Sequence, residues 1–311
     1  MGSAWVLPLG LALLLYGIRR LGAALAELAA AGIQWRLATL GRRPLAAFAA
    51  GLVATVVLQS SSATTVALAC LAEGRLLSLP AAAAAVVGAN VGTTLTAQLL
   101  ARPPEGVAAW VTALGAFLAL LRPAFPGGGP VGRALVGFGL LLWGLEAIDA
   151  AAAPLATHPR LPQQLATLEH RPWAGLVAGF VITTVLDSSS ASIALLQRLV
   201  RAGLLSLEGA VPILFGDNIG TTTATFVIAC TLGARARQVA FVHVLFNVVG
   251  TLALWPFRTT LAAWATAWSD DPARQLAHAH VTFNALNAAL QLPILRLHLT
   301  AARRLFPERD P

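Results

Sequence analysis

One stretch of this chain occurs twice, and this duplication constrains the fold more than any other feature of the sequence. The segment RRPLAAFAAGLVATVVLQSSSATT begins at Arg42, and HRPWAGLVAGFVITTVLDSSSASI begins 128 residues later at His170. They align without a gap, and the same spacing relates GANVGTT (88–94) to GDNIGTT (216–222). The matching residues are types that are rare here, such as Ser triplets, Asn and Arg-Pro. Chance similarity between Ala- and Leu-rich segments therefore does not explain the match, which indicates an internal repeat.

The composition places much of the chain in lipid. Hydrophobic residues make up 57% and charged residues 11% of the chain, whereas an ordinary soluble domain is about 25% charged. A water-soluble fold cannot hide so much apolar surface. The net charge of +8 suggests nucleic acid in a soluble protein, but here the arginines flank apolar runs, as membrane anchors do. We therefore expect contact with membrane lipid and no nucleic-acid partner.

The apolar segments predict three crossings and one hairpin in the first unit. Residues 4–25, 79–100 and 107–122 are predicted to cross, the first of them as a retained helix rather than a cleaved signal peptide. Residues 44–73 are interrupted by the Ser triplet, and each half is too short to cross alone, so we predict a re-entrant helical hairpin with the triplet at its tip. The motif at 88–94 predicts a break in the middle of the 79–100 helix.

An odd number of crossings inverts the second unit relative to the first. The predicted fold is thus an all-α integral membrane protein, one transmembrane domain over 1–311. It contains two inverted-topology repeats, about 4–125 and 131–257, each with a re-entrant hairpin and a broken transmembrane helix. A further helix over about 276–300 is so polar that it should pack against protein.

The basic residues predict an orientation. All 21 are Arg, which together with abundant Ala, Leu and Gly is typical of a GC-rich bacterial genome. If the Arg-rich loop predicted at 19–43 is cytoplasmic, then Arg235, Arg237 and the C-terminal Arg303 and Arg304 also lie inside. We expect a multi-pass protein of the bacterial inner (plasma) membrane with a cytoplasmic C-terminus.

The two Ser tips, entering from opposite faces, should meet near the middle of the bilayer. Each tip begins a half-helix whose free N–H groups, dipole and hydroxyls suit a tetrahedral oxyanion. The predicted phosphate ligands are Ser60, Ser61, Ser62, Ser188, Ser189 and Ser190. Amide, hydroxyl and carboxylate oxygens nearby suit a hard monovalent cation such as Na⁺. The predicted cation ligands are Gln59, Asn90, Thr93, Thr94, Asp187, Asn218, Thr221 and Thr222. We expect no cofactor and no metal other than sodium, because no Cys/His cluster has ligand spacing.

Other interpretations remain open from the residues alone. Membrane Ser and Thr often serve only as interhelical hydrogen-bond partners, and the Gly-x-Asn-x-Gly motifs suit close helix packing. An intramembrane enzyme with Ser61 or Ser62 as nucleophile and His243 as base is a rival, weakened because His243 has no counterpart in the first repeat. A symporter of another small anion and a membrane phosphate sensor are the remaining alternatives.

At the paired motifs the chain resembles the type II sodium–phosphate cotransporters. In that family each of two inverted repeats carries Gln-Ser-Ser-Ser followed by a Gly-x-Asn-x-Gly-Thr-Thr-like motif, and here QSSSATT is followed by GANVGTT, and DSSSASI by GDNIGTT. The resemblance implies a homodimeric, Na⁺-coupled symporter that imports inorganic phosphate by alternating access and is not an enzyme. It also implies that Gln59 and both Ser triplets line the site.

Asp187 and the chain end differ from what the resemblance implies, and a second acid, Asp217, stands beside them as a further open question. Asp187 stands where the family has Gln, which leaves the cation number and the charge moved per cycle open. Asp217 is a second intramembrane acid, for which a helix-end cap is the simpler interpretation. Many bacterial relatives add a cytoplasmic regulatory domain after the membrane part; the chain ends at Pro311, so we expect that domain to be absent.

Overall fold

The chain is helical throughout the parts that the computed structural model describes, residues 5–39, 43–102, 106–121, 128–156 and 161–308, and no strand occurs in those ranges. Five helical stretches there are long and apolar enough to cross a membrane. They are Val6–Leu28, Leu79–Ala101, Gly129–Ala151, Leu207–Cys230 and Ala234–Thr266. Their number and length define a multi-pass integral membrane protein, as the composition predicted.

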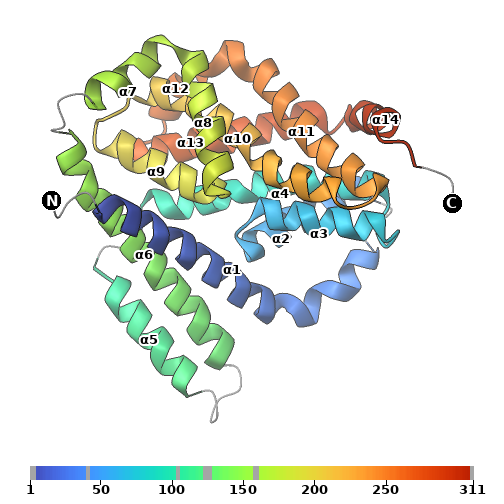
Figure 1. Cartoon of the computed structure of the whole chain (residues 1–311), viewed down its shortest axis with the longest axis horizontal. Helices are drawn as coiled ribbons and strands as arrows, with labels where there is room; N and C mark the ends of the chain where they lie inside the picture. The colour runs from blue at the N-terminus through green and yellow to red at the C-terminus, as the bar shows by residue number, and fades with distance from the viewer. Residues whose placement is uncertain (1–4, 40–42, 103–105, 122–127, 157–160, 309–311) are drawn as a thin grey trace.

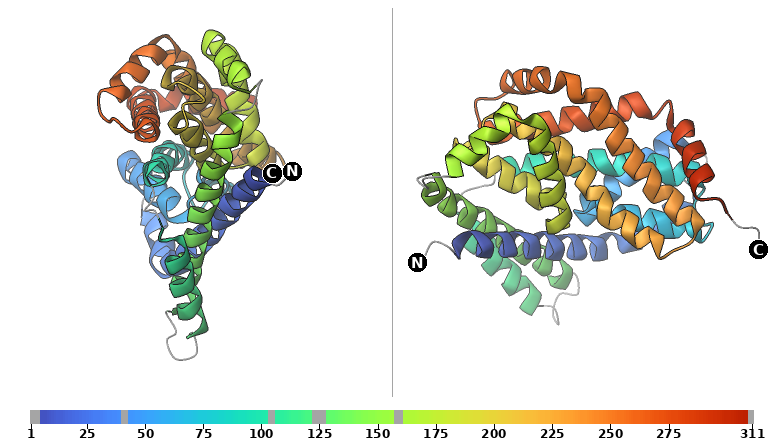
Figure 2. Two further views of the ribbon diagram at one scale, coloured as in Figure 1. Left: turned by 90° about the vertical axis from the view of Figure 1, so that its left-hand side faces the viewer. Right: turned by 45° about the horizontal axis from the view of Figure 1, so that its top comes forward.

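Figure 1 shows how the helices are arranged. In chain order they are α1 (Val6–Thr39), α2 (Pro44–Leu58), α3 (Ser61–Glu73), α4 (Leu79–Ala101), α5 (Ala108–Leu120), α6 (Gly128–Ala156), α7 (Leu161–His170), α8 (Pro172–Leu186), α9 (Ser189–Arg201), α10 (Leu207–Cys230), α11 (Ala234–Leu254), the 3₁₀ helix η2 (Trp255–Phe257), α12 (Arg258–Thr266), α13 (Pro272–Gln291) and α14 (Leu295–Leu305). Helices α5 and α6 pack as a pair that projects from the body, and α1 runs along α6 (Figures 1 and 2).

The helix ends repeat at the spacing of the sequence repeat. Both bounds of α2 and α3 recur in α8 and α9 exactly one repeat length later, so the two pairs have the same helix–turn–helix outline. Each pair starts with Pro in the first turn, where its missing N–H costs nothing. The same local sequence signals thus produce helices with the same bounds in both repeats. The inverted relation of the units and the re-entrant character of the pairs depend on the membrane plane and stay predictions.

The predicted breaks in the long helices are wrong. Helices α4 and α10 run without interruption through both Gly-x-Asn-x-Gly motifs. Their polar side chains bond to their own helix instead of breaking it. Asn90 Nδ2 donates to the Val86 carbonyl at 2.9 Å, and Asn218 Nδ2 donates to the Leu214 carbonyl at 2.8 Å. A side chain that returns its hydrogen bond to the preceding turn needs no gap in the backbone ladder.

The glycines of these motifs serve close packing. A Cβ atom on Gly88 would lie 1.9 Å from the Phe48 carbonyl oxygen of α2, and one on Gly51 would lie 1.8 Å from the Ala85 oxygen of α4. In the second repeat Gly179 and Gly216 make the same contacts between α8 and α10. The two hairpins are therefore held backbone-to-backbone against the long helices, as the packing interpretation anticipated.

Two further boundaries differ from the predictions. Residues 19–43 are not a loop, because α1 continues to Thr39 through a segment that is rich in Ala and Leu and contains no Pro. The single helix predicted over about 276–300 is two helices, α13 and α14. Pro293 lies between them and supplies no backbone N–H to continue the ladder.

Candidate functional site

The first Ser triplet forms the turn between α2 and α3. Gln59 ends α2 in the left-handed conformation, with φ of 53°. Ser60 is extended and caps α3, because its Oγ accepts a hydrogen bond from the Ala63 N–H at 3.1 Å. The Gln59 side chain is buried, and its Oε1 accepts a hydrogen bond from Thr96 Oγ1 of α4 at 3.0 Å. The first tip is thus fixed to its own repeat on both sides of the turn.

The second triplet repeats this backbone geometry with a different side chain beside it. Asp187 ends α8 with φ of 49°, and Ser188 Oγ accepts from the Ala191 N–H at 3.2 Å. The residue that corresponds to Thr96 is Ala224, which has no hydroxyl to donate. Asp187 is exposed where Gln59 is buried. The carboxylate therefore faces the space in front of the tip instead of being bonded behind it.

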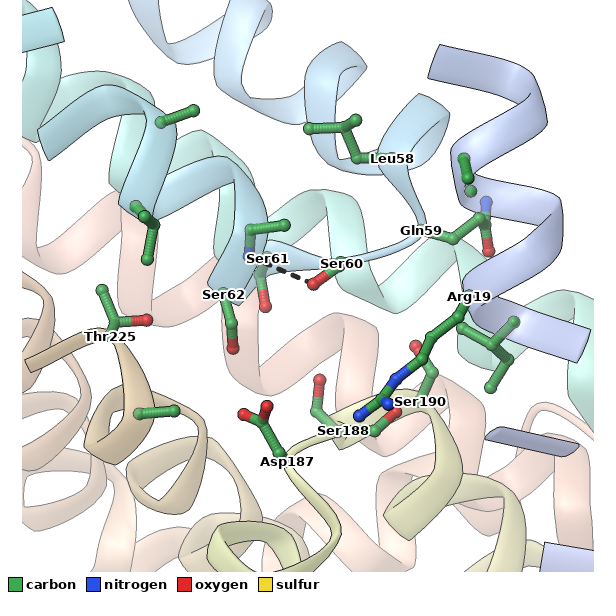
Figure 3. Close-up of a pocket in the computed structure, with 18 of the residues that line it drawn as sticks. Arg19, Leu58, Gln59, Ser60, Ser61, Ser62, Asp187, Ser188, Ser190 and Thr225 are labelled. Atoms are coloured by element: carbon green, nitrogen blue, oxygen red, sulfur yellow. Dashed lines mark hydrogen bonds between the residues drawn. The ribbon is translucent and has the colours of Figure 1, made fainter. Parts of the chain in front are cut away.

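Both tips open into one cavity of about 630 Å³ between α1, the two hairpins and α10 (Figure 3). All six predicted serines line it, together with Gln59 and Asp187. Two segments 128 residues apart in sequence thus line one cavity, and the role of their serines as phosphate ligands stays a prediction. The remaining wall is largely apolar and includes Leu15, Ile18, Ala23, Ala26, Leu58, Val66, Ala67 and Ile228.

The serines are not equivalent in this cavity. Ser60 and Ser188 are occupied as helix caps, and Ser62 Oγ donates to the Thr221 carbonyl of α10 at 3.3 Å. Among the described residues, no group bonds the hydroxyls of the three other serines, Ser61, Ser189 and Ser190. These hydroxyls, with the free N–H groups at the starts of α3 and α9, form a converging set of donors suited to an oxyanion.

Arg19 adds a positive charge that the sequence reasoning missed. It belongs to α1, outside both motifs, and its side chain extends toward the second Ser triplet (Figure 3). The sequence showed it only as part of the Arg pair that closes the first apolar run. Thr225 of α10 also lines the cavity and was missed, because it follows the motif by one turn. Among the described residues, the charged side chains that line the cavity are therefore one cation, Arg19, and one anion, Asp187.

The other predicted cation ligands lie outside the cavity. None of Asn90, Thr93, Thr94, Asn218, Thr221 and Thr222 lines it. Each donates from its side chain to a carbonyl of its own helix. Asn90 Oδ1 also accepts from Asn247 Nδ2 of α11 at 3.2 Å and lies 3.3 Å from His243 Nε2. His243 is therefore engaged with Asn90 and does not line the cavity beside Ser61 and Ser62, which removes the geometry that the rival enzyme needs.

Comparison with known proteins identifies the family of this chain. The profile of the Na⁺/Pi-cotransporter family matches the chain twice in succession, over residues 13–150 and 151–292. The chain belongs to the Na⁺/Pi-cotransporter family. This is a family of transporters, and its members' function supports phosphate transport here. No solved structure gives a significant match to the chain.

Three relatives illustrate the range of the family. The uncharacterized protein YqeW of Bacillus subtilis (strain 168) is 31% identical over 295 residues, 95% of each chain. YjbB of Escherichia coli (strain K12), whose name describes it as a candidate inorganic phosphate export protein, is 30% identical over 254 residues, 82% of this chain and 46% of that protein. Sodium-dependent phosphate transport protein 2A of Rattus norvegicus is 37% identical over 91 residues, 27% of this chain and 14% of that protein.

Proposed function

We propose that this protein is a Na⁺-coupled symporter of inorganic phosphate and that the cavity between the two Ser tips is its anion site. The observation that carries the proposal is the convergence of two helix N-termini, six serines and Arg19 on one cavity. Helix-end N–H groups and hydroxyls bind a tetrahedral oxyanion, and a guanidinium adds a charge and a fork of donors. Bound phosphate then replaces water at the free hydroxyls of Ser61, Ser189 and Ser190.

Asp187 is the proposed ligand of the coupling cation. An ionised carboxylate repels phosphate, so it takes part in binding only through a cation that lies between them. Na⁺ bound at Asp187 removes that repulsion and increases the affinity of the neighbouring donors for the anion. This linkage couples the two solutes, because each binds more tightly when the other is present. The cation role of Gln59, Asn90, Thr93, Thr94, Asn218, Thr221 and Thr222 remains a prediction.

Alternating access is the proposed transport cycle. Two repeats of opposite orientation exchange roles when each hairpin and its long helix move as one body. The Gly-mediated packing of α2 on α4 and of α8 on α10 supports such paired movement. We also propose a homodimer in the bacterial plasma membrane with a cytoplasmic C-terminus. The grouping of Arg75, Arg235 and the C-terminal Glu308 at one end of the molecule, with Arg235 Nε 3.0 Å from Glu308 Oε2, supports that orientation.

Import is the proposed direction, and export is the second candidate because of the name of the Escherichia coli relative. An inward Na⁺ gradient drives a symporter to import phosphate. The test is flux of labelled phosphate in proteoliposomes with the Na⁺ gradient set in each direction, with K⁺ in place of Na⁺, and with arsenate and sulfate as competitors. Phosphate movement that is independent of the Na⁺ gradient would contradict the symport proposal, whereas binding without flux indicates a sensor.

The Ser tips provide the mutational test. The double variant Ser61→Ala and Ser189→Ala loses one free donor at each tip, and a hydrogen bond to a charged group contributes about 1.5–3 kcal/mol. Because two such bonds are lost, we expect the half-saturating phosphate concentration to rise roughly 100-fold or more. Thr300→Ala, which removes an exposed hydroxyl of α14 bonded within its own helix, is the matched control. Unchanged transport by the double variant would show that the tips are only structural.

A further inference from the structure

Asp217 is a buried acid that the cavity does not use. It lies within α10, well inside both ends of the helix, so it is not a helix-end cap. Its side chain is 1% exposed. Thr183 Oγ1 of α8 donates a hydrogen bond to Oδ1, and the hydroxyl of Ser192 on α9 also interacts with the carboxyl group. The second oxygen, Oδ2, is buried and has no hydrogen-bond partner among the described residues.

No positive side chain balances this carboxyl group. Within the described ranges no Arg or His forms an ion pair with Asp217. The basic residues of α9, Arg198 and Arg201, lie at the other end of that helix and pair with Asp149 and Asp271. A buried carboxylate with only neutral partners is costly, and ionisable groups at membrane depth mark ion sites when nothing in the protein neutralises them.

The first repeat shows the same place without the acid. The residue that corresponds to Asp217 is Ala89. The two corresponding hydroxyls, Thr55 Oγ1 of α2 and Thr64 Oγ1 of α3, bond directly to each other at 3.1 Å. In the second repeat a carboxyl group stands beside the equivalent hydroxyls of Thr183 and Ser192. One hydroxyl–hydroxyl bond is thus replaced by an oxygen-only cluster with a formal negative charge and a free oxygen atom.

We propose that Asp217, Thr183 and Ser192 form a binding site for one Na⁺, separate from the cavity and present only in the second repeat. Carboxylate and hydroxyl oxygens are the hard ligands that Na⁺ takes, and the cation supplies the missing positive charge. The three residues come from α10, α8 and α9, so a cation here links both arms of the hairpin to the long helix. Thr183 lies one turn before Asp187 and Ser192 one turn after Ser188, which places the site directly behind the second tip.

The site deepens the proposed function, since a cation behind the tip would order the helix N-terminus that binds the anion. The test therefore measures Na⁺ binding without phosphate. The purified protein in detergent is heated while Na⁺ replaces K⁺ at constant ionic strength, and the shift of the unfolding midpoint gives the apparent Na⁺ affinity. Asp217→Asn keeps the shape and removes the charge. We expect it to weaken apparent Na⁺ affinity about tenfold or more, and to lower the steepness of the Na⁺ dependence of phosphate flux.

Two comparisons make the result decisive. Asp187→Asn should still show the Na⁺-dependent rise of the unfolding midpoint that Asp217 produces. Thr183→Val should weaken that rise, as Asp217→Asn does. The Thr183 variant therefore tests the site even if Asp217→Asn does not fold. If Asp217→Asn or Thr183→Val responds to Na⁺ as the wild type does, the proposed site is wrong. It is also wrong if Asp187→Asn alone abolishes the whole response to Na⁺. Absence of phosphate flux with an intact, Asp217-dependent Na⁺ titration overturns the proposed function and leaves this site standing.

Discussion

The two hairpins share a backbone and differ in charge. In both, the long-helix packing, the left-handed residue at the turn and the Ser cap are the same. The first hairpin is neutral at its tip, where Gln59 is bonded to Thr96. The second carries Asp187 in the cavity and has Asp217 behind it. The two units thus share their architecture, whereas the acids at and behind the tip, Asp187 and Asp217, stand in the second unit, where Gln59 and Ala89 occupy the equivalent places in the first.

The far ends of the hairpins also differ in charge, but there the first hairpin carries an acid and the second a base. At the end of α3, Glu73 Oε2 accepts from the Ala236 N–H at 3.0 Å, in the first turn of α11. At the end of α9, Arg201 donates to the Ala101 carbonyl of α4 at 2.6 Å. Glu73 thus contacts a helix N-terminus, and Arg201 contacts a helix C-terminus. Each charge has the sign that interacts favourably with the helix dipole. Both hairpins are secured at their ends by opposite charges in equivalent places.

The largest expected effect tests the architecture that the hairpins share. Gly51→Ala and Gly179→Ala each place a methyl group where a carbonyl oxygen of the long helix lies, 1.8 and 1.9 Å away. Overpacking of this kind costs about 1–3 kcal/mol or more. Thermal unfolding in detergent should show similar large losses for both, with Gly74→Ala, whose nearest contact is an ordinary 3.5 Å, as control. If only one of the two Gly→Ala variants loses stability, the two hairpins are not packed equivalently on their long helices.

The second prediction concerns the positive charge of Arg19, which belongs to α1 and to neither hairpin. Arg19→Gln removes the guanidinium from the cavity, and we expect the half-saturating phosphate concentration to rise roughly 10- to 100-fold, as for loss of a charge-assisted hydrogen bond. The matched control is Arg20→Gln, because Arg20 stacks over Tyr16 and does not line the cavity. Equal phosphate dependence in the two variants would exclude Arg19 from the anion site.

The third prediction sharpens the difference between the tips. Asp187→Asn should raise the Na⁺ concentration needed for half-maximal phosphate uptake by about tenfold, while changing phosphate affinity at saturating Na⁺ less. Asp187→Gln, which copies the first tip, should remain active with altered coupling. Uptake is measured against Na⁺ concentration at one fixed pH for the wild type and both variants. Superimposable curves for all three proteins would show that Asp187 has no part in coupling.

The smallest expected effect lies at the far end of the first hairpin. Glu73→Gln keeps a hydrogen-bond acceptor near α11 but removes the charge at the helix N-terminus. The expected loss is about 0.3–1 kcal/mol of stability, decreasing at high salt because salt screens a charge near the surface. Unfolding midpoints at low and high salt measure it. A loss that is independent of salt would mean that packing, and not the dipole interaction, is what Glu73 contributes.

Local signals in the sequence were sufficient to predict that the chain is a membrane protein, that it contains a repeat and that each Ser triplet forms the turn between two helices. Apolar length sets what crosses lipid, and the cap preference of Ser together with Pro at the helix start sets where α3, α9, α2 and α8 begin. These signals act over a few residues, so they can be read without the tertiary structure. The paired motifs also identified the family, which the profile matches over both halves.

The tertiary structure decided how the polar residues are used. Gly and Asn in a helix predict a break when viewed alone, but in α4 and α10 the glycines contact a neighbouring backbone and the Asn side chains bond to their own turn. Arg19 reaches the cavity only because α1 passes beside both tips. Asp217 lies against Thr183 only because α8 packs on α10 at contact distance. Each outcome depends on which helices pack together across long sequence separations, and no local pattern encodes that.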